Sequence, residues 1–232
     1  MGRNEALDEL YVLLGQRAGQ VGGPRLLAEC TARDGWPTHG VYFLFEPGEV
    51  REDGVTPRVV RVGSHALTAT SKTKLWDRLR THRGRVGGRN PGGGNHRGSI
   101  FRLHVGTALV NRDGEWPAAA ATWGEGSSAP RETRDREADL ERAVSHHIGA
   151  MAILWVAVPD RLDRAVIERG FIALLSNRSR EAVDPPSDDW LGNYADRAAV
   201  RESGLWNVNH VDDEPGTDAL DRLAVHILRV PG

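Results

Sequence analysis

The sequence is poor in cysteine and has no long hydrophobic run. Its 232 residues include a single cysteine, Cys30, which excludes a disulfide framework and any zinc or iron–sulfur site built from several cysteines. The longest uncharged hydrophobic stretch, residues 148–159, is far shorter than the roughly 20 residues that a bilayer requires, and the first residues contain no apolar signal core. We therefore expect one soluble, cytoplasmic domain with elaborations.

Positive charge is concentrated in one segment. The chain has 30 lysine and arginine residues against 32 acidic ones, so its formal net charge is −2. Residues 72–102 hold two lysines, seven arginines and one acid, Asp77, which gives +8 there and leaves −10 for the other 201 residues. Such a distribution fits one anion-binding face on a neutral to acidic body, although a solvated run of arginines is the commoner explanation of a charge run.

Hydrophobic periodicity predicts the order of the elements. Apolar spacings of three and four residues predict a helix behind Asn4, and two β-rich segments at residues 40–46 and 58–64 predict a hairpin. A helix is expected behind Ser71, followed by a mobile, glycine-rich basic loop at residues 84–98. Later elements are expected in this order: a helix capped by Ser99, a linker or insertion at 111–130, a helix at 131–147, a buried strand at 151–158, a helix beginning near Asp160, and an amphipathic helix in the tail.

Short motifs at the ends of these elements resemble those of the GIY-YIG nuclease superfamily. Gly40, Val41 and Tyr42 open the first strand, and Arg61, Val62 and Gly63 end the second. The next helix carries Arg78 and His82, and the helix after the third strand carries Glu168, followed by Asn177. Because each tripeptide alone recurs by chance, the order and spacing of the motifs over residues 40–177 carry the resemblance.

The resemblance implies an α/β (α+β) fold with a small three-stranded central sheet flanked by helices. Residues 36–180 would form the nuclease-like domain, with an insertion at about residues 111–148. Residues 1–35 would form an N-terminal helical extension, and residues 181–232 a C-terminal extension packed on the same domain.

The resemblance implies metal-dependent hydrolysis of phosphodiester bonds in nucleic acid. The favoured form of this activity is an endonuclease that acts on DNA. This chemistry needs a base, a cation to neutralise the phosphate, and a Lewis acid for the leaving oxygen. Tyr42 would be the base if Arg78 or Arg61 stabilises its phenolate. Arg78 would also clamp the phosphate. His82, one turn further on, would pass a proton or orient the tyrosine. Asn177 would be a positioning residue, although it lies nearer to Glu168 than the family's asparagine usually does, and Asn207 and Asn209 are later candidates for the same role.

Glu168 would be the metal ligand. The helical pattern places it on a face with Ala165, Phe171 and Ile172, where a lone carboxylate is costly unless it is paired, protonated or bound to a metal. A salt bridge to Arg164 or Arg169 is the structural alternative. A site with one carboxylate and waters suits Mg²⁺, with Mn²⁺ as a second option.

A basic face would bind the nucleic acid by releasing counterions from its phosphates. The residues assigned to it are Arg61, Lys72, Lys74, Arg80, Arg83, Arg85, Arg89 and Arg97. No membrane partner is expected, and a homodimer is an option because single-site nucleases often dimerise to cut both strands.

One departure from the family pattern keeps two other functions open. Arg61 stands where the second motif has a tyrosine, so a hydroxyl beside the scissile phosphate is missing. A catalytically impaired nucleic-acid-binding module would bind in a salt-sensitive manner and release no product. A protein-interaction module, in a bacterial defence or repair assembly, would use the basic segment to meet an acidic partner.

Overall fold

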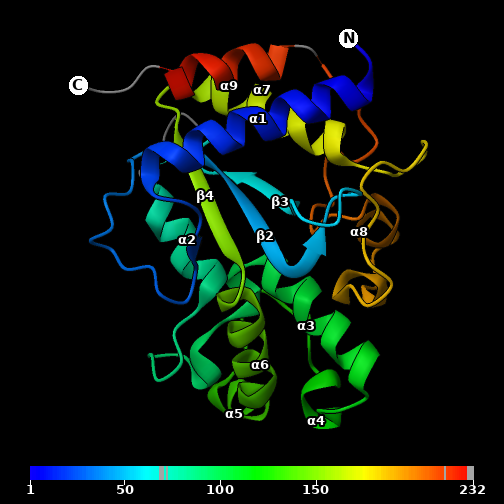
Figure 1. Cartoon of the computed structure of the whole chain (residues 1–232). Coiled ribbons are helices and arrows are strands. Elements are labelled where there is room, and N and C mark those ends of the chain that lie inside the picture. The colour runs from blue at the N-terminus through cyan, green and yellow to red at the C-terminus, as the bar shows by residue number, and fades with distance from the viewer. Residues whose placement is uncertain (68–70, 72, 217, 229–232) are drawn as a thin grey trace.

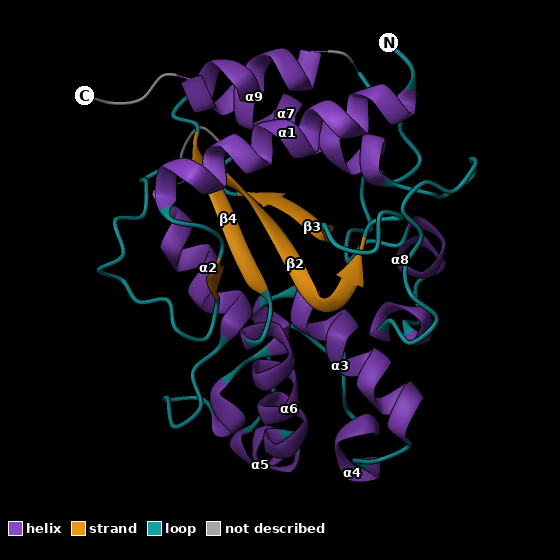
Figure 2. Ribbon diagram, in the orientation of Figure 1, coloured by secondary structure: helices purple, strands orange, loops and turns teal. Residues whose placement is uncertain are grey.

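A computed structural model describes residues 1–67, 71, 73–216 and 218–228 (Figure 1). In that part of the chain the central sheet has four antiparallel strands in the order β1-β4-β2-β3 (Figure 2). The strands are β1 (Arg25–Leu26), β2 (Gly40–Val50), β3 (Pro57–Ser64) and β4 (Ala152–Ala157). The sequence predicts the last three. The two-residue β1 is too short to produce an alternating pattern and was not predicted.

Two groups of helices enclose the sheet. The helices of the described chain are α1 (Arg3–Val21), α2 (Leu75–Arg83), η1 (Pro91–Gly93), η2 (His96–Gly98), α3 (Ile100–Asp113), α4 (Pro117–Ala120), α5 (Arg131–Arg136), α6 (Ala138–Gly149), α7 (Arg161–Leu175), η3 (Leu191–Tyr194), α8 (Ala198–Ser203) and α9 (Asp218–Leu228). In Figure 1, α1, α7 and α9 lie together at the top, and α3 to α6 form the opposite end. This arrangement confirms the expected α+β class.

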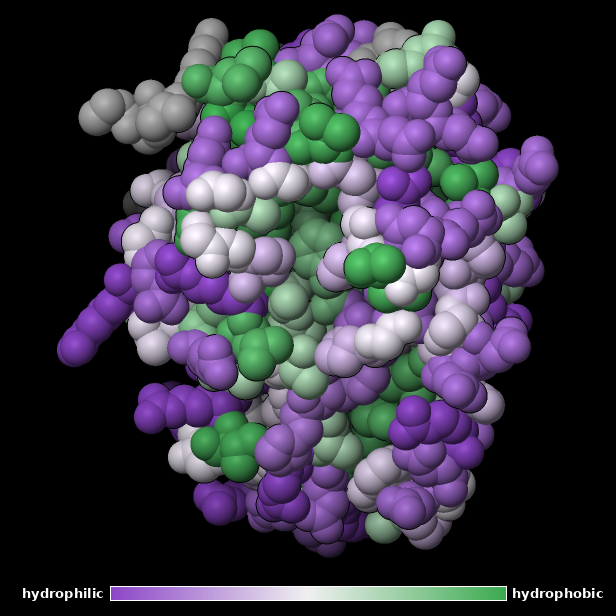
Figure 3. All heavy atoms as spheres, viewed as in Figure 1, coloured by the Kyte–Doolittle hydropathy of each residue, from purple (hydrophilic) through white to green (hydrophobic). Residues whose placement is uncertain are grey.

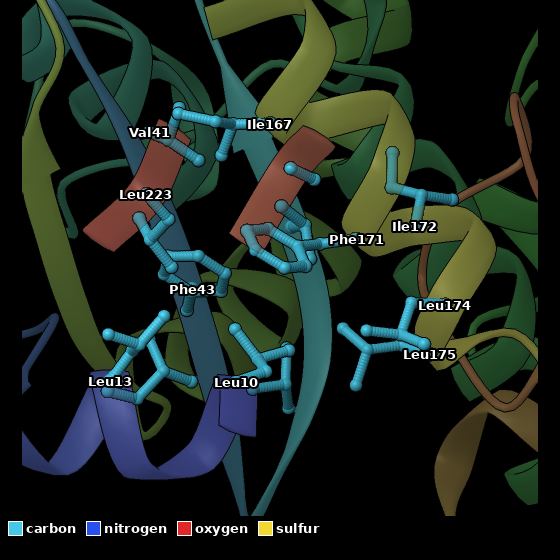
Figure 4. Packing of buried hydrophobic residues seen from close by; sticks show 14 of the residues in the cluster. Leu10, Leu13, Val41, Phe43, Ile167, Phe171, Ile172, Leu174, Leu175 and Leu223 are labelled. Atoms are coloured by element: carbon cyan, nitrogen blue, oxygen red, sulfur yellow. The ribbon is translucent and has the colours of Figure 1, made fainter. Parts of the chain in front are cut away.

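Alternating side chains of β2 divide the core into two clusters. Val41, Phe43 and Phe45 face α1, α7 and α9, and the Phe43 and Phe171 ring centroids are 6.0 Å apart (Figure 4). Tyr42 and Leu44 point to the other side, into the cluster built from α2, α3 and α6. Because successive strand residues point to opposite faces, Tyr42 is fixed on the face that carries the basic helix α2.

Local capping explains where two helices begin. Ser99 accepts a hydrogen bond from the backbone N–H of Arg102 at the start of α3, and Asp160 accepts one from Asp163 at the start of α7, as expected. The two other expected caps are wrong. The first helix begins at Arg3 with Asn4 inside it, and α2 begins at Leu75 rather than behind Ser71, because Asp77 binds the backbone N–H of Lys74 and closes the first turn there.

The buried ion pair between Arg102 and Glu141 joins α2, α3 and α6. Arg102 is 0 % exposed, and its Nε lies 3.0 Å from Glu141 Oε2. Its Nη1 donates to the backbone oxygens of His82 and Arg83 at the end of α2. Burial would raise the pKa of the Glu141 carboxyl, but the hydrogen bond from His96 and the charge of Arg102 outweigh burial and lower the pKa.

The chain after Leu175 covers the outer edge of β3. The backbone N–H of Trp206 donates to the oxygen of Val60 at 2.8 Å. The side-chain amide of Asn207 then donates to the oxygen of Val62 and accepts from its N–H, at 2.8 and 3.1 Å. Further along, the indoles of Trp190 and Trp206 both donate to the buried carboxylate of Glu46. The tail is thus attached to the sheet by polar contacts as well as by packing.

Candidate active site

The two strand motifs meet at Tyr42 and Gly63. These residues are directly opposite each other in the β2–β3 ladder. A side chain at position 63 would not fit, because a Cβ atom there would lie 2.3 Å from the Tyr42 hydroxyl oxygen. Glycine at the end of β3 is therefore what allows the Tyr42 ring to lie across that strand.

A buried chain of hydrogen bonds leads away from the Tyr42 hydroxyl. His82 Nε2 lies 3.1 Å from that oxygen, and His82 Nδ1 lies 2.7 Å from Ser99 Oγ. Ser99 Oγ accepts from the N–H of Arg102 and can also donate to His82 Nδ1 or accept from it. A neutral His82 can therefore either donate from Nε2 to the Tyr42 hydroxyl or accept the Tyr42 proton there, depending on which ring nitrogen carries its hydrogen.

Burial keeps His82 in its neutral form. The side chain is 0 % exposed. Burial first, and then the positive charges of Arg61, Arg78 and Arg102, hold the pKa of His82 well below its usual range. His82 is therefore uncharged at neutral pH.

This depressed pKa predicts a pH dependence of stability. Below about pH 6.5 the unfolded chain takes up a proton on His82 that the folded chain refuses, so the free energy of unfolding falls as the pH falls. We expect a His82→Gln variant to lose less stability than the wild type between pH 7.5 and 5.5 in urea denaturation. Burial also lowers the pKa values of His65 and His104, but both residues are present in the wild type and in the variant. Their contributions to the pH dependence therefore cancel when the two proteins are compared. Equal slopes for the two proteins would contradict this prediction.

Arg61, which replaces the motif tyrosine, is a buried residue. It is 7 % exposed, and its Nη1 donates to the backbone oxygen of Trp206 at 2.7 Å. Its Nε lies 3.4 Å from the Tyr42 hydroxyl, and its guanidinium lies over the Phe101 ring. Arg61 therefore donates an N–H to the Tyr42 hydroxyl and does not form an exposed phosphate contact.

Glu168 reaches the end of β3 from the opposite face of the sheet. Its two carboxylate oxygens accept hydrogen bonds from the backbone N–H and the hydroxyl of Ser64, at 3.1 and 2.5 Å. The side chain is half-buried. The salt-bridge alternative is not observed, because Arg164 donates to four backbone oxygens and Arg169 pairs with Asp213. Tyr42 and Glu168 thus approach neighbouring residues, Gly63 and Ser64.

The donor set at Glu168 is compatible with a hard divalent cation. In the described residues no group of three or more His, Cys, Asp or Glu side chains could hold a metal ion. Mg²⁺ does not need such a cage, because it retains several waters and commonly binds through one or two carboxylates. The carboxylate of Glu168 has no cationic partner among the described side chains, so its charge is available.

Arg78 lies one turn before His82 and faces a cavity. The cavity has a volume of about 350 Å³ and is also lined by Gly98, Ser99 and Ile100 at the start of α3. Within the described part of the chain, the guanidinium of Arg78 forms no hydrogen bond or ion pair. Arg80, in contrast, points into solvent with its side chain 62 % exposed and pairs with Asp77.

The other residues assigned to nucleic-acid binding fall into two groups. Arg83 and Arg97 are structural: Arg83 donates to backbone oxygens after β1, and Arg97 forms a buried bidentate pair with Glu137. Lys74, Arg80, Arg85 and Arg89 are exposed. Lys72 lies outside the described residues.

Asn177 is not brought to this site. It lies just beyond the end of α7, and its side-chain oxygen accepts hydrogen bonds from Arg3 and from the backbone N–H of Val183, both at 2.9 Å. Ser64 and Ser99, which sequence reasoning did not select, hold Glu168 and His82 in place. The signal for Ser64 was its position directly after the second motif, whereas Ser99 was recognised only as a helix cap.

Comparison with known proteins adds one finding to this geometry. A family model described as a GIY-YIG domain matches residues 1–231, a span that includes α1 and the tail as well as the motif region. No curated protein and no solved structure matches the chain. In the described residues no helix is long and apolar enough to cross a membrane.

Proposed function

Because the chain belongs to the GIY-YIG domain family, whose general activity is that of a nuclease, we propose that it is a metal-dependent endonuclease that cleaves DNA. The observation that carries the proposal is that Tyr42 and Glu168 contact adjacent residues, Gly63 and Ser64, at the end of β3, while Arg78 lies one turn before His82, which contacts the Tyr42 hydroxyl. The substrate phosphodiester would lie against this strand end.

In this proposal Arg78 neutralises the phosphate, Tyr42 gives its hydroxyl proton to His82 Nε2, and the resulting phenolate accepts the proton of the attacking water. Arginine suits the first role because its planar fork can contact two phosphate oxygens at once. The two N–H donors that face the Tyr42 oxygen, from His82 and Arg61, stabilise negative charge on it. His82 orients the tyrosine and is held in turn by Ser99.

Glu168 is the residue that would hold the metal, Mg²⁺ or Mn²⁺, and the metal would supply Lewis-acid stabilisation of the leaving oxygen. Ser64 fixes the direction of the carboxylate through two hydrogen bonds, which leaves further lone pairs on both oxygens for coordination. Outer-shell contacts of this kind orient metal ligands.

One observation favours a second candidate, a nucleic-acid-binding module with impaired catalysis. Tyr42 is 0 % exposed, and its hydroxyl is enclosed by His82, Arg61 and Gly63. A base must touch the water that it deprotonates. If this enclosure persists with substrate bound, the protein would bind nucleic acid in a salt-sensitive manner and leave it intact.

Incubation with supercoiled plasmid, single-stranded DNA and RNA, each with Mg²⁺ or EDTA, separates these functions. We expect the plasmid to be cut with Mg²⁺ and to stay intact with EDTA. DNA that is bound by the protein but stays uncut both with Mg²⁺ and with EDTA would support the binding module. A protein that does not bind DNA even at low salt would contradict both candidates. Size-exclusion chromatography of the free and DNA-bound protein would show whether a homodimer forms.

Substitution of Arg78 tests the phosphate clamp. Arg78→Ala should lower the cleavage rate about 10²-fold, because the positive charge at the phosphate is lost. Arg142→Ala, which removes an exposed arginine of α6 that pairs with Asp139, is the control and should change the rate less than about threefold. Equal effects of the two substitutions on the initial rate would contradict the role of Arg78.

A further inference from the structure

The basic segment after α2 is a packed structure. It was expected to be a mobile loop, but it forms η1 and η2 and lies against α6. Gly92 has a φ angle of +67°, and a Cβ atom there would lie 2.0 Å from the backbone oxygen of Ala138. Its glycines permit a close approach to α6, so the side chains that leave this segment have defined positions.

A second cavity lies between this segment and α5. Its volume is about 230 Å³, and it is lined by Arg89, Asn90, Pro91, Arg131 and Arg134. None of these five residues is acidic. The cavity shares no lining residue with the one beside Arg78. Figure 3 shows hydrophilic side chains projecting at the lower left of the molecule, where Figure 1 has the segment that follows α2.

The arginines of this cavity are poorly neutralised by the protein itself. Arg134 Nε is buried without a hydrogen-bond partner among the described residues. Arg131 approaches Asp135 at 3.4 Å, but both side chains are largely exposed, so that pair is weak. Within the described ranges, the side chain of Arg89 forms no hydrogen bond or ion pair. Leaving a buried guanidinium N–H without an acceptor is unfavourable, and an anion bound beside Arg134 would relieve that cost.

We propose that the cavity formed by Arg89, Arg131 and Arg134 binds a backbone phosphate of the nucleic acid, at a distance from the bond that is cut. This inference rests on the proposed function. A tetrahedral phosphate presents oxygens in several directions and can therefore be shared by three guanidinium groups, and arginine is the side chain best suited to such contacts.

The surroundings favour nucleic acid over an acidic protein as the source of this anion. One continuous segment, residues 85–100, supplies Arg89 to this cavity and Ser99 to the cavity that Arg78 faces. A strand of regularly spaced phosphates can follow that path and occupy both cavities. The site would contribute affinity and register but would not touch the reacting atoms.

The test compares Arg134→Ala with Arg136→Ala, two arginines on the same helix of which only the first lines the cavity. Binding of a labelled 30-base-pair duplex is measured at several salt concentrations in the presence of Ca²⁺ or EDTA. We expect Arg134→Ala to weaken binding about tenfold and to reduce the slope of log K against log salt by about 1, because one phosphate contact is lost. Arg136→Ala should change neither quantity appreciably.

A double-mutant cycle shows whether the arginines share one phosphate. Arg89→Ala and Arg134→Ala combined should weaken binding far less than the product of their separate effects. Multiplicative effects, or equal effects of Arg134→Ala and Arg136→Ala, would overturn the inference while leaving the proposed function intact. A wild-type protein that does not bind the duplex at low salt would refute the proposed function itself. Inorganic phosphate alone should compete weakly, since it occupies only one of the contacts.

Discussion

Glu168→Gln is expected to reduce plasmid cleavage by about 10³-fold or more while binding of the duplex is retained. Glutamine keeps the size of the side chain and its acceptor oxygen for Ser64, but it removes the negative charge that a divalent cation requires. The measurement is the initial rate of plasmid nicking at saturating Mg²⁺, together with the affinity for uncut duplex in EDTA.

Two further variants make this result specific. Glu181→Gln removes an exposed carboxylate beyond α7 and should leave the rate unchanged. Ser64→Ala removes the hydroxyl contact to Glu168 but keeps the backbone one, so we expect an intermediate loss of about tenfold. Wild-type cleavage by Glu168→Gln would show that the metal is held elsewhere or is not used.

Arg102→Ala should lower the free energy of unfolding by about 3–5 kcal/mol, because it leaves the Glu141 carboxylate buried without its cation. It also frees the backbone oxygens of His82 and Arg83, which Arg102 now satisfies. Urea denaturation at pH 7.5, followed by circular dichroism, measures the loss.

The double variant Arg102→Met/Glu141→Leu should recover part of that stability, because no unpaired buried charge remains, although the backbone oxygens of His82 and Arg83 and the N–H of His96 still lack their partners. Arg112→Ala, which breaks a surface pair with Asp113, should cost less than about 1 kcal/mol. A loss in Arg102→Ala no larger than that in Arg112→Ala would show that the buried pair does not hold the three helices together.

Sequence periodicity and capping predict most of the fold. The two motif strands, the buried strand at Ala152–Ala157 and the helices behind Ser99 and Asp160 have strong local signals, and the structure confirms them. The structure also places Tyr42 opposite Gly63 and Glu168 at Ser64. The catalytic roles of these residues stay predictions until the variants are assayed.

What the sequence could not reveal depends on contacts between distant segments. Nothing local distinguishes Arg97, which is buried against Glu137, from Arg89, which is exposed. The meeting of Arg89 with Arg134 depends on how α5 and α6 pack against the preceding segment. The order of the family's motifs points to Asn177 as an asparagine that follows Glu168, but it lies past the end of α7, where Arg3 donates to its side-chain oxygen.

The attachment of Trp206 and Asn207 to β3 has a consequence for aggregation. An unpaired strand edge is a template on which other chains can add, and here the groups of Val60 and Val62 along that edge are satisfied by residues that lie far later in the chain. A nascent or clipped polypeptide that ends before this segment would leave β3 open to intermolecular pairing. The tail therefore covers this edge of β3 and protects the sheet from pairing with other molecules.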